Sequence, residues 1–408
     1  MQAAQPQDES ELSALLEEAS KKERPLELIG RGSKRDYGRP LQVEDSVQLE
    51  AFSGVRFYEP EELVLSVGAA TPMAEIETLL DSRKQMLAFE PMDLAPLLSG
   101  AVAERRADSI GGVVACNLAG PRRPKAGAAR DHVLGLEGVS GEGARFKAGG
   151  RVVKNVTGYD LCKLLSGSFG TLAAMTQIVL KVLPRAEKTR TLLFFGLNAS
   201  TATALFTRAL GSAYEVSAAA HLPEPLAAAS RVDPIGGAGG SVTAVRLEGP
   251  APSVIARQAG LTQLLGDLAA PGGELHAQRS LQFWREIRDC HPFVGRSDCA
   301  IWRLSLPPAK AVEALAALAP APADAFLDWG GGLLWLARPQ QRPEIPGGET
   351  LLAALGVHAT LVKADAAVRA VQPFFLPRSP ATTLLAERIK QSFDPKQVLN
   401  PGRLYAGL

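Results

Sequence analysis

The sequence lacks several features that would place it in a common class of protein. It has four cysteines in 408 residues, and no two of them form a CxxC pair. This scarcity argues against an iron–sulfur cluster or a cysteine-rich zinc site within the chain, and it fits a reducing compartment. Lys and Arg together number 44 and Asp and Glu 43, so there is no net positive field to attract nucleic acid or an anionic membrane.

Membrane spans and targeting signals are also missing. The apolar runs break well before the roughly 18 residues that a span needs. The opening residues, MQAAQPQDESELS, have no basic start and no apolar run, so we expect no signal peptide. We therefore expect a cytoplasmic protein that only a partner would bring to the inner face of a membrane.

The chain does contain enough apolar material for sizeable cores, at 46% of its residues. Its length predicts two to four domains of about 100–200 residues each. Apolar spacing at Leu12, Leu15, Leu16 and Ala19 predicts a first helix, and a strand follows at residues 26–29. Two alternating strands and a helix after Thr71 and Pro72 complete an α-β-β-β-α opening.

Two later parts of the chain differ from this opening. From about residue 190, strand-like and helix-like pieces alternate, which indicates a separate α/β or α+β domain. Near the end, Ser379 and Pro380 predict the start of a helix that carries Leu384, Leu385 and Ile389.

Glycine-rich turns are the main candidates for a binding site. The turn at residues 30–34, Gly-Arg-Gly-Ser-Lys, follows a strand, and its backbone N–H groups could form an anion-binding nest. An ordinary turn is the alternative, because the turn matches neither GxGxxG nor GxxxxGK[ST]. The stretches Ser109–Gly112 and Gly167–Leu172 could bring backbone against a flat ligand.

These motifs follow one another in an order that resembles the FAD-binding domain of the vanillyl-alcohol-oxidase, or PCMH-type, flavoprotein superfamily. The similarity sharpens in KNVTGYDL (154–161), FWREIRDCHPF (283–293) and FDPKQVLNPGRLY (393–405), where the chain is similar to the FAD-binding E subunits of bacterial glycolate oxidases. The resemblance implies an α+β fold. It implies an FAD-binding domain of residues 1–184, to which residues 376–408 return, and a cap, or substrate, domain of residues 185–375.

The resemblance also implies which residues hold FAD. The turn of Gly30, Arg31, Gly32, Ser33 and Lys34 matches the pyrophosphate loop of the superfamily. Further positions match segments along the diphosphate and the flavin: Pro91, Gly111, Gly112, Asn117, Asp131, Asn155, Gly158, Asp160, Gly167, Gly170, Thr171 and Asn400. Backbone donors suit phosphates, and Asn or Asp side chains suit the polar edge of the ring.

We expect the FAD to be bound non-covalently. Many members of the superfamily tether flavin to a histidine, but no histidine occurs in residues 1–131. His132 lies in the cofactor segment, and a satisfied, partly buried imidazole is the alternative for it. Cys162 is a remote candidate for a cysteinyl link, since buried free cysteines are usually inert.

Catalytic residues are harder to identify. Oxidation of a 2-hydroxy acid needs a base for the hydroxyl proton and a cation or metal for the carboxylate. With five histidines and no HxH or HxxxH pattern, we predict no metal site. His358 is the best candidate for the base, and Arg285, Arg288 and Arg303 are the best candidates for binding the carboxylate. Salt bridges or a solvated surface are the alternatives for these residues.

Two functions from different classes remain open. In the first, the chain is the FAD-binding subunit of a glycolate oxidase complex, where a small 2-hydroxy acid is oxidised and electrons pass through flavin to a separate iron–sulfur subunit. In the second, the chain binds FAD without substrate chemistry, as an electron-relay or structural subunit beside a homologous catalytic flavoprotein. A self-sufficient dehydrogenase for another small hydroxy acid is a third, weaker reading. All three predict no nucleic-acid partner.

Overall fold

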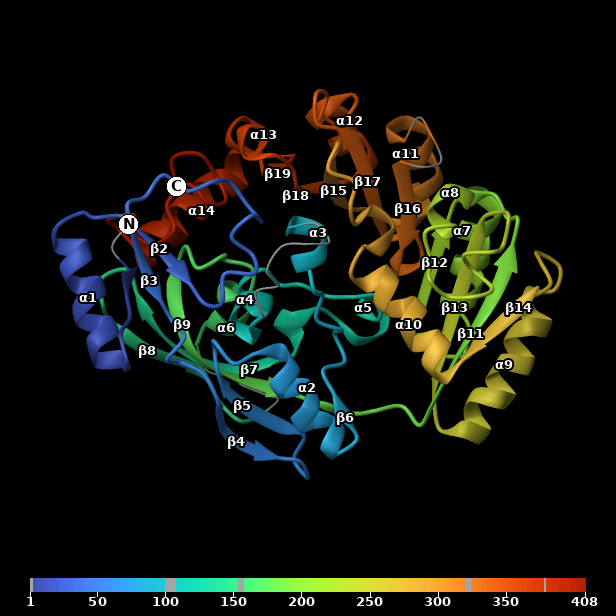
Figure 1. Ribbon diagram of the computed structural model, residues 1–408, viewed down its shortest axis with the longest axis horizontal. Coiled ribbons are helices and arrows are strands. Elements are labelled where there is room, and N and C mark those ends of the chain that lie inside the picture. Colours follow the sequence, from blue (N-terminus) through green and yellow to red (C-terminus); the bar gives the residue numbers. More distant parts are fainter. Residues whose placement is uncertain (1–2, 100–107, 153–157, 320, 322–323, 378) are drawn as a thin grey trace.

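The computed structural model describes residues 3–99, 108–152, 158–319, 321, 324–377 and 379–408. Two regions lie side by side in Figure 1. We call residues 3–184 together with 379–408 the base, and residues 185–377 the cap. The chain crosses once from the base into the cap after residue 184 and returns at its red C-terminal end, which lies near the N-terminus (Figure 1).

The base contains two main sheets. A three-stranded parallel sheet has the order β1-β3-β2, and a five-stranded antiparallel sheet has the order β4-β5-β9-β7-β8. The strands are β1 (Ala3–Ala4), β2 (Leu26–Ile29), β3 (Asp45–Gln48), β4 (Val55–Glu59), β5 (Val64–Gly68), β7 (Val133–Ser140), β8 (Arg145–Gly149) and β9 (Ala173–Lys181). A short pair, β6 (Gln85–Met86) and β10 (Leu183–Pro184), lies where the chain leaves for the cap.

Seven helices accompany these strands in the described part of the base: α1 (Glu9–Lys21), α2 (Met73–Ser82), α3 (Ala95–Ser99), α4 (Ile110–Ala115), α5 (Arg123–Ala126), α6 (Leu161–Leu165) and α14 (Pro380–Phe393). The buried face of α1 is formed by Leu12, Leu16 and Ala19, as the sequence spacing predicts. Helix α2 follows Thr71 and Pro72 as predicted, with Pro72 rather than Thr71 at its N-cap. Thr71 instead hydrogen-bonds the carbonyl oxygens of Gly54 and Gly68, which satisfies the turn after β5.

The cap is built on one nine-stranded antiparallel sheet with the order β14-β11-β13-β12-β16-β17-β15-β18-β19. Its strands are β11 (Lys188–Phe195), β12 (Ala218–Leu222), β13 (Val242–Gly249), β14 (Gly273–His276), β15 (Cys299–Ser305), β16 (Ala325–Asp328), β17 (Leu333–Pro339), β18 (His358–Lys363) and β19 (Phe375–Leu376). Its helices are α7 (Ala199–Leu210), α8 (Glu224–Ala227), α9 (Ala251–Leu265), α10 (Ala277–Arg288), α11 (Ala311–Leu318), α12 (Gly348–Leu355) and α13 (Ala366–Val371). All four tryptophans are buried in this region, so they belong to its core.

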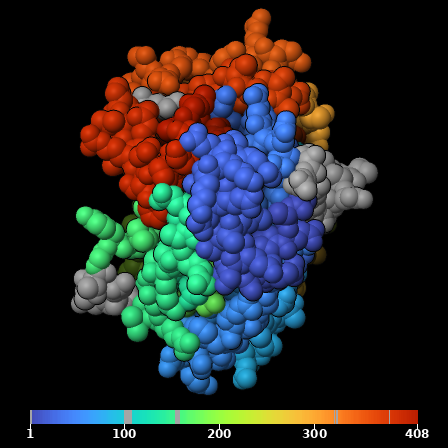
Figure 2. Space-filling model, turned by 90° about the vertical axis from the view of Figure 1, so that its left-hand side faces the viewer, coloured from blue at the N-terminus to red at the C-terminus, as the bar shows by residue number. Residues whose placement is uncertain are grey.

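The C-terminal segment is locked into the base by polar contacts. Helix α14 begins at the predicted place, where the Ser379 side chain accepts from the Thr382 N–H, but Leu384 and Leu385 are exposed. Its buried residue is Lys390, whose ammonium donates to Asp394 at 2.6 Å and to the Thr171 and Leu399 carbonyl oxygens. Figure 2 shows the C-terminal residues (red) beside the N-terminal residues (blue) on one face of the molecule.

A buried ion-pair cluster joins the cap to the base. Arg246 on β13 donates to both carboxylate oxygens of Glu90 in the base, at 2.8 and 3.1 Å. Arg122 of the base makes a bidentate pair with Glu248, with both distances 2.8 Å. Burial alone would raise the pKa of Glu90, but Arg122 and Arg246 together hold it below its usual range. We call these four residues the clamp.

Candidate functional site

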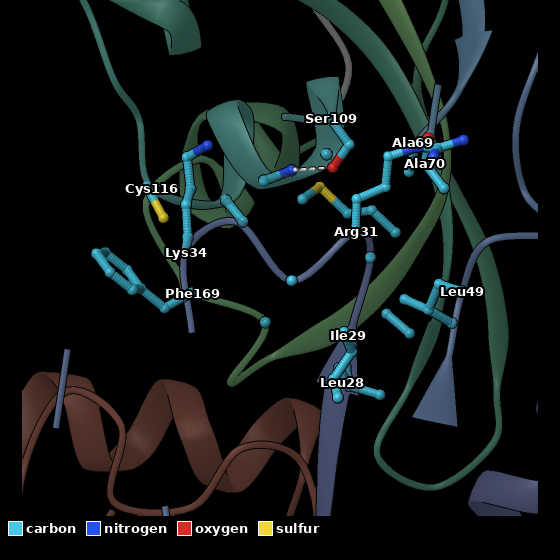
Figure 3. Close-up of a pocket in the computed structure, with 18 of the residues that line it drawn as sticks. Leu28, Ile29, Arg31, Lys34, Leu49, Ala69, Ala70, Ser109, Cys116 and Phe169 are labelled. Carbon is cyan, nitrogen blue, oxygen red and sulfur yellow. Dashed lines mark hydrogen bonds between the residues drawn. The ribbon is translucent and has the colours of Figure 1, made fainter. Parts of the chain in front are cut away.

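The base contains a cavity of about 790 Å³, including open space at its mouth. It lies where β2 ends, between the turn at residues 30–34, the start of α4 and the turn before β9 (Figure 3). Leu49, Ala69 and Ala70 also line it, and Asn400 and Arg403 of the C-terminal segment complete it.

The turn at residues 30–34 wraps one end of this cavity. Gly32 has φ +74°, a left-handed conformation that glycine adopts without strain. All five predicted loop residues line the cavity. Opposite the turn, the Ser109 side chain caps α4 by accepting from the Gly112 N–H. A Cβ added to Gly112 would lie 3.5 Å from Cδ of Lys34, so the absence of a side chain leaves room between the two segments.

Basic residues of this cavity differ in their partners. Arg31 donates from Nε to the Ala70 carbonyl at 3.0 Å, and no described carboxylate lies within ion-pair distance of it. Figure 3 shows Arg31 reaching toward Ala69 and Ala70. Lys34 pairs with Asp108, and both side chains are 9% exposed. Arg35 donates to both carboxylate oxygens of Glu27, at 3.0 and 2.5 Å.

The C-terminal segment completes the wall. Asn400 accepts from the Leu28 N–H and donates to the Phe169 carbonyl, both at 2.8 Å, so its side chain ties β2 to the turn before β9. A Cβ on Gly170 would lie 2.8 Å from the Asn400 amide nitrogen, and the φ of Gly170 is +68°. Arg403, which the sequence analysis did not single out, lines the cavity and donates to the carbonyl oxygens of Arg35 and Arg39.

The structure brings together at this cavity many of the residues predicted to hold the cofactor: Gly30, Arg31, Gly32, Ser33, Lys34, Gly111, Gly112, Gly170 and Asn400. Two others, Asn117 and Gly167, lie next to each other, since a Cβ on Gly167 would be 3.4 Å from that of Asn117. Thr171 is buried behind the wall, where its carbonyl accepts from Lys390, and Pro91 is also buried.

The remaining predicted cofactor residues lie outside the cavity lining. Asp131 is exposed and accepts from the Ala128 N–H, whereas Asp160 is exposed and caps α6. Gly158 is exposed, with φ +76°. Asn155 falls outside the described residues. Of the described positions, Asp131, Gly158 and Asp160 do not line the cavity, although the sequence pattern led us to expect it.

A second polar group lies where the cap meets the base. The Arg303 guanidinium is 4.8 Å from the Trp329 ring centre, and Arg123 of the base lies over the same ring at 4.5 Å. The Trp329 indole N–H donates to the Gly120 carbonyl of the base at 3.0 Å. Nε of Arg303 is buried and has no hydrogen-bond partner in the described structure, and burial lowers the pKa of this arginine.

Asp328 accompanies this group and was missed by the sequence analysis. It is 2% exposed and accepts from the Trp329 N–H at 2.7 Å. Burial raises its pKa to about 7, and the carboxylate of Glu90 adds to the rise. The signal that could have revealed it is the run DWGGG, in which Trp329, Gly330 and Gly331 all have positive φ and form a sharp turn.

The histidines are scattered rather than gathered. His358 is exposed at the start of β18 and does not line the cavity. His132 is buried, with Nε2 2.8 Å from the Ala126 carbonyl, and burial lowers its pKa. The described residues contain no group of three His, Cys, Asp or Glu placed to hold a metal ion. No described helix has the combined length and apolar character that a bilayer crossing requires.

The residues of the cavity fit FAD. A dinucleotide needs donors for two phosphates and apolar walls for its rings. The turn at 30–34 offers backbone and side-chain donors, and Arg31 is a cation without an acidic partner among the described residues. The walls are largely apolar, with Leu28, Ile29, Leu49, Phe169 and Met175 among them. Cys116 lies at the same wall, and burial raises the pKa of its thiol to about 12, so it stays protonated.

Comparisons with known proteins agree with this fit. A family model described as an FAD binding domain matches residues 2–149. The glycolate oxidase subunit GlcE of Escherichia coli (strain K12) is 34% identical over 385 residues, which cover 94% of this chain and 93% of that protein. The glycolate oxidase subunit GlcD of Bacillus subtilis (strain 168) is 44% identical over 85 residues, or 21% of this chain and 18% of that protein.

Solved structures extend the similarity to the whole fold. The 4-ethylphenol oxidase from Gulosibacter chungangensis superposes with a TM-score of 0.67 at 13% identity, covering 98% of this chain and 88% of that one. Together with the family match, this confirms the predicted α+β PCMH-type fold and the prediction of FAD as the cofactor.

Proposed function

Because the chain belongs to the family of the glycolate oxidase subunit GlcE, an FAD-binding oxidoreductase subunit, we propose that it takes part in oxidising glycolate, or a closely related 2-hydroxy acid, to the 2-oxo acid. The observation that carries this proposal is the cavity at residues 30–34, 111–112, 170 and 400, which suits a dinucleotide. FAD, when bound, supplies the two-electron redox chemistry of such a reaction. The chain's own residues must then bind the acid and take its hydroxyl proton.

Arg303 is our candidate for the substrate carboxylate. Its Nε is buried and unpartnered in the described structure, and it lies on the cap strand that faces Trp329 and the base. The carboxylate of a bound substrate would accept a hydrogen bond from Nε of Arg303 and form a charge-assisted pair with its guanidinium. We assign the proton to Asp328 in place of His358, because a carboxyl with a pKa near 7 can accept a proton at neutral pH.

The names of its relatives support a proposal about the complex around this chain. Both GlcE and GlcD are named as subunits, and GlcD is similar to part of this chain. We propose a homologous flavoprotein subunit as one partner and an iron–sulfur subunit as the electron acceptor. The four cysteines of this chain are free and are not gathered, so an iron–sulfur cluster would have to belong to a partner. Contact with the inner face of a membrane would then come through these partners.

One observation favours the second reading, in which the chain relays electrons without acting on substrate. No histidine, aspartate or glutamate lines the cavity in the part of the chain that the structure describes. Arg303 and Asp328 both contact Trp329, and neither lines the cavity. A relay subunit needs only the flavin and a partner, whereas a dehydrogenase needs substrate to reach Arg303.

An anaerobic titration separates the two readings. The FAD-loaded chain is mixed with glycolate or D-lactate, first alone and then with the partner subunits, and the flavin absorbance is followed. Bleaching of the chain alone supports its own substrate chemistry, and Arg303→Met should abolish it while the exposed Arg279→Met should not. A flavin that bleaches only with partners supports the relay. A chain that takes up no FAD refutes both.

The same preparation tests two further proposals. We propose that FAD is held without a covalent bond, since Cys162 is buried and burial raises its thiol pKa to about 11. Acid precipitation should leave the yellow colour in solution, and a yellow pellet would refute this. We also propose that residues 1–184 with 376–408 and residues 185–375 are the two domains, which limited proteolysis can test by cleavage near the crossings.

A further inference from the structure

The turn at residues 30–34 contacts a carboxylate of the chain itself. Oδ1 of Asp108 accepts from the Ser33 hydroxyl at 2.9 Å and from the Ser109 N–H at 3.0 Å, and it also accepts from the Lys34 ammonium. One oxygen thus has three donors. They are a loop hydroxyl, a loop ammonium and a backbone amide, and both Ser33 and Lys34 line the cavity.

This donor set is the kind that binds a phosphate oxygen. Backbone amides, hydroxyls and lysine ammonium groups recur at phosphate sites because each donates to an acceptor-only, negatively charged oxygen. A carboxylate oxygen is also an acceptor only, so Asp108 fills the same role with one negative charge. With 9% exposure on both sides, Lys34 and Asp108 leave little water between them.

Asp108 and a bound diphosphate therefore conflict. Two anions that share these donors would repel each other, and neither offers a hydrogen for the other to accept. Lys34 has three N–H donors but here directs its charge at Asp108. Arg31 lacks an acidic partner in the described structure, yet it lies on the other side of the loop, where Nε donates to Ala70.

We propose that the Asp108 carboxylate competes with the FAD diphosphate for Ser33, Lys34 and the Ser109 N–H. The inference rests on the proposed function, since it requires this cavity to hold FAD. FAD binds only when Asp108 leaves Lys34, and the competition weakens cofactor retention by the chain. Asp108 is thus a built-in anion that stabilises the loop in the cofactor-free protein and sets how readily the cofactor is released.

The test is the dissociation constant of FAD for the full chain, measured by quenching of flavin fluorescence. Asp108→Asn removes the charge and keeps the shape, so FAD should bind about tenfold more tightly, equal to 1.4 kcal/mol. Asp108→Ser gives a second neutral variant if the amide disturbs folding. Asp81→Asn is the matched control, because it removes the same charge from an exposed ion pair with Arg185 and should leave the constant unchanged.

Lys34→Met distinguishes competition from general charge repulsion. Lys34→Met alone should weaken FAD binding. In the Lys34→Met background, the gain from Asp108→Asn should shrink to about threefold or less, since contacting residues are not additive. An undiminished gain in that background would mean repulsion at a distance and would overturn the inference.

Two other outcomes are equally clear. If wild type binds FAD and Asp108→Asn binds it equally or more weakly, Asp108 positions Lys34 for the cofactor and the inference fails while the proposed function stands. If neither wild type nor any neutral variant takes up FAD, the proposed function fails and the inference fails with it.

Discussion

The cavity of the base and the clamp differ in how their basic side chains are paired with carboxylates. Arg246 in the clamp is fully buried and is held by Glu90 and Glu248, so its single positive charge is already compensated. At the cavity, Arg31 has no acidic partner in the described structure, and Lys34 has a single carboxylate, Asp108. The two arginines of the clamp are thus paired with two glutamates, whereas Arg31 at the cavity has no carboxylate partner among the described residues and can receive an anion. The difference distinguishes structural charge from binding charge.

Removal of Glu90 should have the largest effect. Glu90→Ala leaves Arg246 buried without one of its two carboxylates, which typically costs about 3–5 kcal/mol of unfolding free energy. Because the pKa of Glu90 is lowered, the clamp stays ionised as the pH falls to about 5, and the loss should persist there. Denaturant unfolding measures it. Asp267→Ala, which breaks an exposed pair with Arg208, should cost at most about 1 kcal/mol. Equal losses of unfolding free energy for Glu90→Ala and Asp267→Ala would show that the clamp contributes no more than an exposed ion pair.

Acidification should destabilise the protein through a buried histidine in the cap. His221 is 4% exposed and burial lowers its pKa to about 4. The His221 imidazole takes up a proton near pH 6.5 in the unfolded chain and only near pH 4 in the folded chain. The stability that the neutral imidazole contributes is therefore fully present above pH 6.5. It is lost as the pH falls to 4, by on the order of 3 kcal/mol. His221→Gln should flatten the pH dependence of unfolding in this window, and the exposed His358→Gln should not. An unchanged slope for His221→Gln would contradict the account.

Filling the cavity should affect binding rather than folding. A valine at Gly112 places its side chain between Ser109 and Lys34, where a Cβ meets atoms at 3.4 and 3.5 Å. We expect Gly112→Val to weaken FAD binding by about a hundredfold, or 2.7 kcal/mol, with little change in the unfolding temperature. Gly237→Val in an exposed cap loop, where a Cβ meets nothing within 4 Å, is the control. Tight binding by Gly112→Val would show that FAD does not occupy this space.

The smallest effect is expected on α14. Leu384 and Leu385 are 49% and 58% exposed, so replacing both with serine should change stability by no more than about 0.5 kcal/mol. Lys390→Met on the same helix should cost several-fold more, because it leaves Asp394 buried without its cation. Thermal unfolding compares the two variants. A large loss for the leucine variant would show that the helix is held by its apolar side chains instead.

Local features of this fold could be predicted from the sequence. The strand at Leu26–Ile29 has the predicted bounds, and α14 starts at its predicted Ser379 cap, because both depend on residues close in the chain. Strand β12 was missed, since Ala218–Leu222 is mostly alanine, a residue depleted in strands. Its neighbours β13 and β16 make it a strand by pairing with it on both edges.

Long-range polar contacts could not be predicted in the same way. The loop at residues 30–34 was identified from its glycines, but nothing in its sequence indicates that Asp108, 74 residues from Lys34, would reach it. The same holds for Glu90 and Arg246, which are 156 residues apart. Charge patterns along a sequence show which groups exist, whereas only the packing of the base against the cap decides which of them meet.

The side chain of Asn400 has a consequence for the order of assembly. It bonds the backbone of Leu28, a residue made 372 positions earlier, and it supplies one wall of the cavity. A ribosome must therefore finish almost the whole polypeptide, cap included, before that wall exists. We therefore expect a chain that ends before this asparagine to retain flavin less well than the full chain.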